Sequence, residues 1–322
     1  PSGGGSYIVA HANLGPVPGL VAAAALSVGY ILTVSVSIAS AVDQMVSTAP
    51  GLVDHRVVLG VAAIAIVTVT NLRGIRESGS IFSIPTYVFL GVMYTLIGVG
   101  LLRLAMGNLE VAPAPTALPE ATAVTGGASI FLLLRAFATG SAVMTGTEAI
   151  SNGVPVFQPP EPRNAARTLV AMGAILASMY LGLTFIVTHI GMVPTEDDTI
   201  ISQLAKLVFG EGLLYYVVQA ATILILILAA NTAYADFPRL ASFLAGDNYA
   251  PHQLAFRAER LAFSNGIILL GMMSALLIVA FGGSTGALLP LYALSVFLAF
   301  TLSQAGMVAH WRRVRGPRWQ AK

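Results

Sequence analysis

The sequence contains no cysteine, and this absence excludes several kinds of chemistry. These residues can form no disulfide, no thiolate metal site and no cysteine nucleophile. Charged residues are also scarce, since 16 Lys and Arg and 14 Asp and Glu make up only 9% of the 322 residues. Soluble domains carry about 25% charged residues, so the composition excludes a soluble globular fold. The net charge of +2 is too small to indicate a nucleic-acid partner.

Sequence motifs for catalysis and cofactor binding are missing as well. There is no Gly-x-x-x-x-Gly-Lys loop for ATP, and no His-Glu-x-x-His or Gly-x-Ser-x-Gly motif for hydrolysis. The five histidines share no helical spacing and fall near the ends of apolar runs or in loops: His11, His55, His189, His252 and His310. We therefore predict that the chain is not an enzyme and uses no cofactor.

Long hydrophobic runs dominate the sequence, which is 56% hydrophobic with a mean hydropathy of +0.82. As helices, such runs can cross a hydrocarbon core of about 30 Å. They predict an all-α polytopic membrane protein in which residues 1–322 form a single domain. Eight spans are expected, at 17–42, 57–72, 78–102, 128–157, 168–193, 212–235, 264–281 and 287–309. A glycine-rich turn at 281–286 separates the last two.

Basic residues predict the orientation, because short cytoplasmic loops are enriched in Lys and Arg. The loops on one side hold only Arg56, Arg103 and Lys206. The loops and tail on the other side hold Arg73, Arg76, Arg163, Arg167, Arg239, Arg257, Arg260, Arg312, Arg313, Arg315, Arg318 and Lys322. Both ends of the sequence are therefore expected on the cytoplasmic side of the membrane.

The segment 236–263 follows the sixth expected span on the cytoplasmic side. Its residues Leu240, Phe243 and Leu244 recur at helical spacing, which predicts a short amphipathic helix lying on the membrane face. The simpler interpretation is a solvated connector without a function of its own.

The fourth expected span contains helix-breaking residues at mid-membrane depth, including Gly146 and Pro155. Irregular backbone survives there only where it lines a cavity, as in transporters whose broken helices hold ions. Glu148 lies in the same stretch, and a carboxylate inside a membrane indicates function. Thr145, three residues earlier, would add a hydroxyl on the same face. The alternative is that the span ends near residue 147 and Glu148 lies at the interface.

Hydroxyl side chains in the first and last spans are further candidates. Such groups bind ions in some proteins, but more often they bond to their own backbone or join helices. The last span also contains Pro290, which frees a carbonyl and bends the helix. The candidates are Tyr30, Thr33, Ser35, Ser37 and Ser40 in the first span and Tyr292 in the last.

Several stretches of the sequence carry a resemblance to a known family. Residues 1–10 resemble the loop between the second and third helices of the amino acid/polyamine/organocation (APC) superfamily of permeases. More specific matches resemble the KimA-type potassium importers of bacteria, at residues 145–155, 231–240, 263–266 and 289–294.

This resemblance implies a LeuT-like fold of two inverted five-helix repeats. The chain would hold family helices three to ten, without the first two helices, the last two helices or the cytoplasmic regulatory domain of the family. The resemblance also implies which residues bind the ion. Thr145 and Glu148 match the ion-coordinating pair, with Gly146 between them, and Tyr292 and Ser40 match further ligands.

The sequence thus predicts a secondary transporter in the bacterial plasma membrane, with a proton-coupled potassium importer as the first hypothesis. Thr145, Ser40, Tyr292 and carbonyls near Gly146 would hold K⁺, while Glu148 would neutralise charge or carry the proton. An amino acid permease of the same superfamily is the alternative, and a membrane scaffold or sensor is a third. The expected partners are the substrate and the lipid bilayer, and a homodimer is left open.

Overall fold

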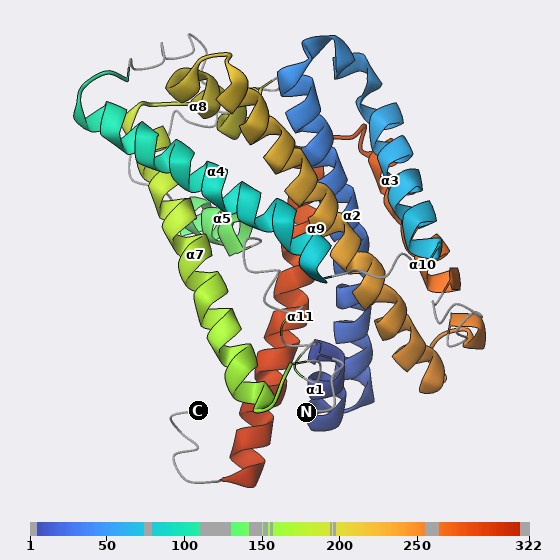
Figure 1. The fold of residues 1–322 in the computed structure, drawn as a ribbon. Helices are drawn as coiled ribbons and strands as arrows, with labels where there is room; N and C mark the ends of the chain where they lie inside the picture. Colours follow the sequence, from blue (N-terminus) through green and yellow to red (C-terminus); the bar gives the residue numbers. More distant parts are fainter. Residues whose placement is uncertain are drawn as a thin grey trace.

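The computed structural model describes residues 5–73, 79–109, 130–141, 150, 154, 157–193, 195, 198–254 and 264–315. Their regular structure is helical, without a strand in these ranges. Figure 1 shows a bundle with α2, α9 and α11 at its centre, and with α1 and the end of α11 at the same end. The elements are α1 (Gly5–Leu14), α2 (Pro16–Thr48), η1 (Pro50–His55), α3 (Arg56–Leu72), α4 (Gly79–Ala105), α5 (Ile130–Ser141), α7 (Glu161–His189), α8 (Ile200–Phe209), α9 (Leu213–Gly246), η5 (His252–Leu254), α10 (Ser264–Ala280) and α11 (Thr285–Val314).

Six helical segments of the described residues are long and apolar enough to cross a membrane. They are Pro16–Thr48, Pro50–Leu72, Ser83–Ala105, Glu161–His189, Leu213–Gly246 and Thr285–Val314. The expected all-α polytopic membrane protein agrees with this architecture. α10 is apolar but has only 17 residues, and only α5 is described in the first half of the fourth expected span. The number of eight spans therefore stays a prediction.

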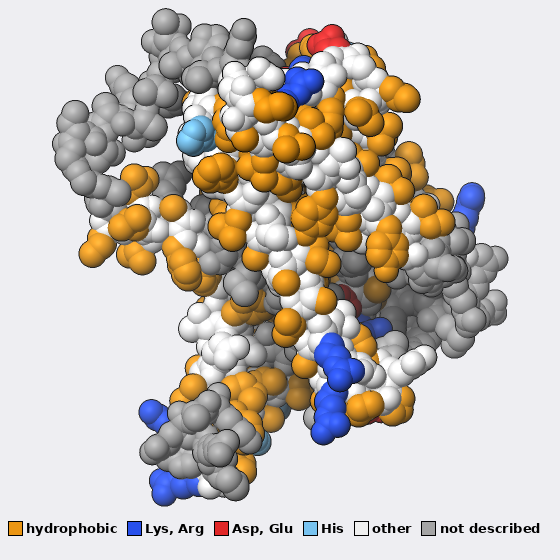
Figure 2. Space-filling view, turned by 60° about the vertical axis from the view of Figure 1, so that its left-hand side comes forward, with side chains coloured by type: hydrophobic (Ala, Val, Ile, Leu, Met, Phe, Trp, Pro, Cys, Tyr) orange, Lys and Arg blue, Asp and Glu red, His pale blue; other side chains and the backbone are white. Residues whose placement is uncertain are grey.

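α2 is the most enclosed of the long helices. In its most apolar stretch 56% of the residues are buried inside the protein, against 17% for α7. Small buried residues such as Ala22, Ala23 and Ala39 let neighbouring helices come close. α7, by contrast, exposes Val170 and Leu181, and Figure 2 shows hydrophobic side chains spread over the outside of the molecule. A surface of this kind faces lipid rather than water.

The turn expected at 281–286 is present. α10 ends at Ala280 and α11 begins at Thr285. Between them, Gly282 and Gly283 have φ angles of 62° and 71°, which L side chains rarely adopt. Ser284 caps the next helix, because its hydroxyl accepts a hydrogen bond from the Ala287 backbone N–H at 3.3 Å.

The helix boundary expected at residue 236 is absent, because α9 continues unbroken to Gly246. Leu240 is buried in a core cluster with Tyr7 of α1 and Leu26 of α2, and Phe243 and Leu244 pack against the same cluster. The apolar side of this segment is therefore covered by protein, which is why the helix continues instead of starting a separate element. Residues 255–263 of the predicted connector lie outside the described part.

The two ends of the bundle differ in charge. At the end near α1, the described residues include Arg163, Arg167, Arg239, Arg312, Arg313 and Arg315, whereas Arg73 follows the end of α3, where Asn71 bonds to Asn231 midway along α9. Arg56, Arg103 and Lys206 lie at the opposite end, near the start of α3, the end of α4 and in α8. The asymmetry expected from the sequence is thus also an asymmetry in space.

Candidate functional site

A cavity of about 260 Å³ lies between α2, α9 and α11. Its polar groups are hydroxyls and one carboxylate, and none of the described residues that line it is basic. The lining residues are Ala25, Leu26, Gly29, Tyr30, Thr33, Ser37, Ala229, Thr232, Ala233, Asp236, Tyr292, Ser295, Val296 and Ala299.

Helical periodicity explains why these residues share one space. Gly29, Thr33 and Ser37 recur every fourth residue on α2, so they lie on one face of that helix. Thr232 and Asp236 have the same spacing on α9. Because α9 and α11 run opposite to α2, their later residues meet its earlier ones. Ser37 therefore lies toward the α8 end of the cavity and Asp236 toward the α1 end.

Tyr292 and Thr33 meet at the wall of the cavity. The Thr33 hydroxyl lies 3.2 Å from the Tyr292 hydroxyl and 2.9 Å from the Gly29 carbonyl oxygen. The Tyr292 ring is 8% exposed and packs with Leu32 and Leu288. The ring thus fixes the hydroxyl next to that of Thr33, and together they present two neutral oxygens to the cavity.

Gly29 leaves room one turn closer to α1. A Cβ atom at this position would lie 3.3 Å from the Ser295 hydroxyl oxygen, closer than most real Cβ contacts. Ser295 is itself buried, and its hydroxyl donates to the Tyr292 carbonyl at 2.8 Å. The missing side chain at Gly29 therefore preserves the width of the cavity between α2 and α11.

Asp236 contributes the carboxylate and was missed by sequence reasoning. The charge-free window ends at residue 235, which predicts that Asp236 belongs to the connector. α9 in fact continues beyond it, and Asp236 is half-buried on the cavity wall. The signal that could have found it is the pattern Ala229, Thr232, Ala233 and Asp236, which is one small or polar helix face.

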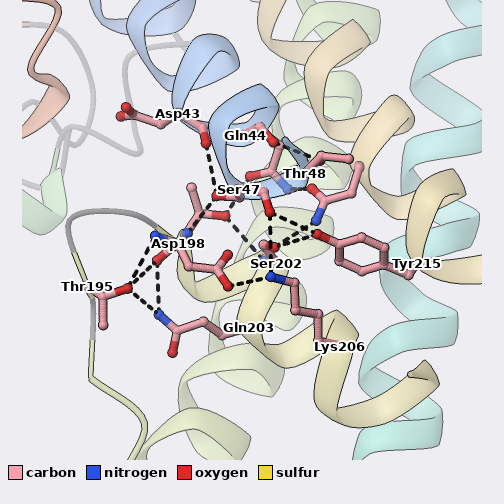
Figure 3. A network of polar contacts seen from close by, with 12 residues as sticks. Asp43, Gln44, Ser47, Thr48, Thr195, Asp198, Ser202, Gln203, Lys206 and Tyr215 are labelled. Carbon is pink, nitrogen blue, oxygen red and sulfur yellow. Dashed lines mark hydrogen bonds and ion pairs between the residues drawn. The ribbon is translucent and has the colours of Figure 1, made fainter. Parts of the chain in front are cut away.

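A network of polar side chains connects α8 to the end of α2 and the start of α9 (Figure 3). The Thr199 hydroxyl donates to the Gln44 side-chain oxygen at 2.7 Å, and the Thr199 N–H donates to the Ser47 hydroxyl at 3.0 Å. Buried Gln44 and Gln219 are hydrogen-bonded to each other, and Gln219 also donates to Ser202 at 2.8 Å. Because every one of these bonds joins two helices or a helix and a loop, α8 is held firmly across this end.

Lys206 on α8 also belongs to this network. Its ammonium nitrogen lies 2.9 Å from an Asp198 carboxylate oxygen. Burial by itself lowers the pKa of Lys206, but the hydrogen bond and charge of Asp198 outweigh it and leave the pKa raised. Lys206 therefore stays charged and paired at neutral pH.

At the opposite end, α1 is bonded to α9. The buried Tyr7 hydroxyl donates to an Asp247 carboxylate oxygen at 2.5 Å. Burial and this hydrogen bond raise the pKa of Tyr7 well above its usual range. The cavity thus lies between two polar junctions, one with α8 and one with α1.

A comparison with protein families gives this geometry its context. The family model described as amino acid permease matches residues 1–321. The chain belongs to the amino acid permease family. Its predicted place in the APC superfamily is thereby confirmed.

The chain is also similar to a curated protein, the potassium transporter KimA of Bacillus subtilis (strain 168). The two sequences are 46% identical over 322 residues, which is all of this chain and 53% of the relative. The chain therefore spans about half the length of the relative that it matches. Family and relative are described as a permease and a transporter, in agreement with the prediction that the chain is not an enzyme.

The structure places the residues predicted from the sequence as follows. Tyr292 lines the cavity, as do Thr33 and Ser37. Ser40 is half-buried on α2 but is not among the lining residues. Ser35 instead joins α2 to α10, since its hydroxyl lies 3.2 Å from the Ser274 carbonyl oxygen. Thr145, Gly146 and Glu148 lie outside the described residues, so their predicted roles stay predictions.

Proposed function

We propose that this chain forms the substrate-binding part of a proton-coupled potassium importer in the bacterial plasma membrane. The observation that carries the proposal is the cavity between α2, α9 and α11. It offers several hydroxyls and one carboxylate, and none of its described lining residues is Lys, Arg or His. Hard monovalent cations are held by oxygen ligands, and a nearby negative charge adds to their affinity. The name of the relative, potassium transporter, supports the same substrate.

The described ligands in this proposal are Thr33, Ser37 and Tyr292. Thr33 and Tyr292 already lie 3.2 Å apart through their hydroxyls, so one cation could contact both oxygens. From the family resemblance we add Thr145, carbonyls near Gly146, and Ser40. Glu148 would neutralise charge or carry the coupled proton, because a membrane carboxylate can take up and release a proton.

The remaining architecture is proposed on the same basis. Membership in the permease family supports a LeuT-like inverted repeat, with this chain as helices three to ten and eight spans. The concentration of arginines near α1 supports an orientation with that end in the cytoplasm. In that orientation α8 lies on the outer side, and the cavity would connect to the cytoplasm at its α1 end.

The second candidate is an amino acid permease, which the family description favours. An amino acid needs a partner for its α-carboxylate, supplied in such transporters by the positive end of a broken helix. The described lining offers an acidic side chain for an amine but no base for a carboxylate. The hydroxyls and the single carboxylate of the described lining can hold a simple cation without such a helix end, which is why potassium is the first candidate.

Growth and uptake measurements test the proposal. The protein as its gene encodes it should restore growth of a potassium-uptake-deficient bacterium at low K⁺, and it should take up rubidium as a tracer. Uptake should fall strongly in the Glu148→Gln variant, which keeps shape but removes charge and titration. Uptake of labelled amino acids without any potassium rescue would establish the second candidate instead.

A further inference from the structure

The carboxylate of Asp236 belongs to a different level of the cavity from the hydroxyls of Thr33 and Tyr292. Val34 of α2 shares a core cluster with Ala230 and Ala233 of α9, whereas Leu26 shares one with Leu240. The antiparallel course of the two helices places Asp236 between these pairs, level with Gly29 and Tyr30. This level is about 6 Å, one helical turn, closer to α1 than Thr232.

The surroundings at this level favour a cation. Tyr30 and Ser295 also line the cavity near Gly29, and both carry hydroxyl oxygens. Gly29 contributes no side chain, so the space between α2 and α11 stays open there. Acidic residues are rare in membrane-spanning helices, and those that line a cavity mark ion or substrate pathways.

We propose that Asp236 binds the transported monovalent cation at the α1 end of the cavity, one helical turn beyond the hydroxyls of Thr33 and Tyr292. The inference rests on the proposed transport function and adds a residue and a position to it. A cation that leaves the neutral hydroxyl level meets the charge of Asp236 before it reaches the end of the bundle. The carboxylate lowers the energy of the cation at this level, and the other described residues that line the cavity are uncharged.

The position of Asp236 on a continuous helix supports a binding role over a purely structural one. α9 runs without interruption from Leu213 to Gly246, so the backbone of Asp236 is held by the helix. Its neighbours Phe237 and Leu240 face the core, which fixes the rotation of the helix about its axis. The helix backbone and the buried neighbours of Asp236 therefore place its side chain on the cavity wall.

Cation binding by the purified protein tests this inference. With the protein as its gene encodes it, the rise of melting temperature with K⁺ concentration reports affinity. We expect Asp236→Asn to raise the half-saturating K⁺ concentration about tenfold, which corresponds to 1.4 kcal/mol. Asp236→Glu keeps the charge and should recover most of the affinity. Rubidium uptake by cells that express each variant should follow the same order.

Asp247→Asn is the matched control. It removes the same charge at the residue that directly follows α9, outside the cavity, and should leave the half-saturating K⁺ concentration unchanged. Melting in the absence of K⁺ shows whether each variant is folded. If wild type and Asp236→Asn bind K⁺ equally, or Asp236→Glu is as weak as Asp236→Asn, the inference is overturned while the proposed function stands. A wild-type protein that neither binds nor takes up K⁺ would overturn both.

Discussion

At the scale of single residues, Tyr292 combines packing with chemistry. Sequence reasoning left open whether it is a packing residue or an ion ligand. Its ring is buried against Leu32, Val36 and Leu288, while its hydroxyl lies at the cavity wall near Thr33. The two roles therefore belong to different atoms of one side chain, and a substitution can separate them.

The Tyr292→Phe variant removes the hydroxyl and keeps the ring. Loss of one membrane hydrogen bond averages about 0.6 kcal/mol, so a pure packing residue would barely change K⁺ affinity. If the oxygen binds the cation, the half-saturating K⁺ concentration for uptake should rise about tenfold. Tyr234→Phe is the control, because the buried Tyr234 hydroxyl bonds to Thr68 on α3 and does not line the cavity. Equal effects of the two variants would argue against Tyr292 as a ligand.

Gly29 offers a second test at this scale. In Gly29→Ala the new Cβ meets the Ser295 hydroxyl at 3.3 Å, so the cavity narrows although the fold is kept. We expect the half-saturating K⁺ concentration to rise about threefold, or 0.7 kcal/mol. Adding Ser295→Ala removes the crowded oxygen and should restore part of the affinity. Gly98→Ala on α4, where a Cβ would meet nothing within 4 Å, should have no effect on uptake.

At the scale of elements, α8 is short but is held in place by polar bonds and by buried side chains. It has 10 residues, too few to cross a membrane, but Ser202, Leu204, Ala205 and Val208 are all buried. The buried amides of Gln44 and Gln219 connect α2, α8 and α9 in one network. In the proposed orientation this network closes the outer end of the bundle.

Removing one amide from this network should destabilise the protein. Gln219→Ala takes away the acceptor of the buried Gln44 amide nitrogen, and such a loss costs about 2 kcal/mol. It also removes one bond of the Ser202 hydroxyl, which keeps its contact with Tyr215. A thermal melt in detergent should show a clearly lower melting temperature. Gln203→Ala is the control, since the Gln203 side chain bonds to Val193, Thr195 and Asp198 in the adjacent segment and has no hydrogen bond to α2 or α9 among the described residues. A melting temperature for Gln219→Ala no lower than that of Gln203→Ala would mean that the network contributes little to stability.

At the scale of the whole molecule, charge and apolar surface define two ends and a belt between them. The arginines gather near α1, and the apolar side chains of α4 and α7 cover the sides (Figure 2). Such a surface is stable only where lipid surrounds the belt, and in the proposed orientation the basic end faces the cytoplasm.

Thiol labelling can test this orientation, because these 322 residues contain no cysteine that would react as background. Arg163→Cys places a thiol at the arginine-rich end and Glu211→Cys places one at the opposite end, both at exposed positions. In intact cells a membrane-impermeant thiol reagent should label Glu211→Cys and spare Arg163→Cys. Both should react after the cells are opened. The reverse pattern in intact cells would invert the proposed topology.

The site was only partly predictable from the sequence. Tyr292 was found because a proline precedes it and because the family resemblance includes it. Ser37 could not be separated from Ser35 and Ser40, since three serines in six residues leave open which face meets the cavity. The expected end of the sixth span at residue 235 is wrong, because a charged residue does not by itself end a helix. A helix whose polar residue faces an internal cavity can continue beyond that charge.

The sequence by itself determined the membrane character, the helical class and the difference in charge between the ends. These properties follow from composition and from local runs of residues, so they need no knowledge of neighbours. Only the tertiary structure decided which faces of α2, α9 and α11 meet, that Asp236 shares a cavity with Thr33 and Tyr292, and that α8 is bonded to α2. These relations depend on how helices far apart in the chain are packed and rotated, because residues that recur on one helix face acquire a common site only when another helix comes to lie against them.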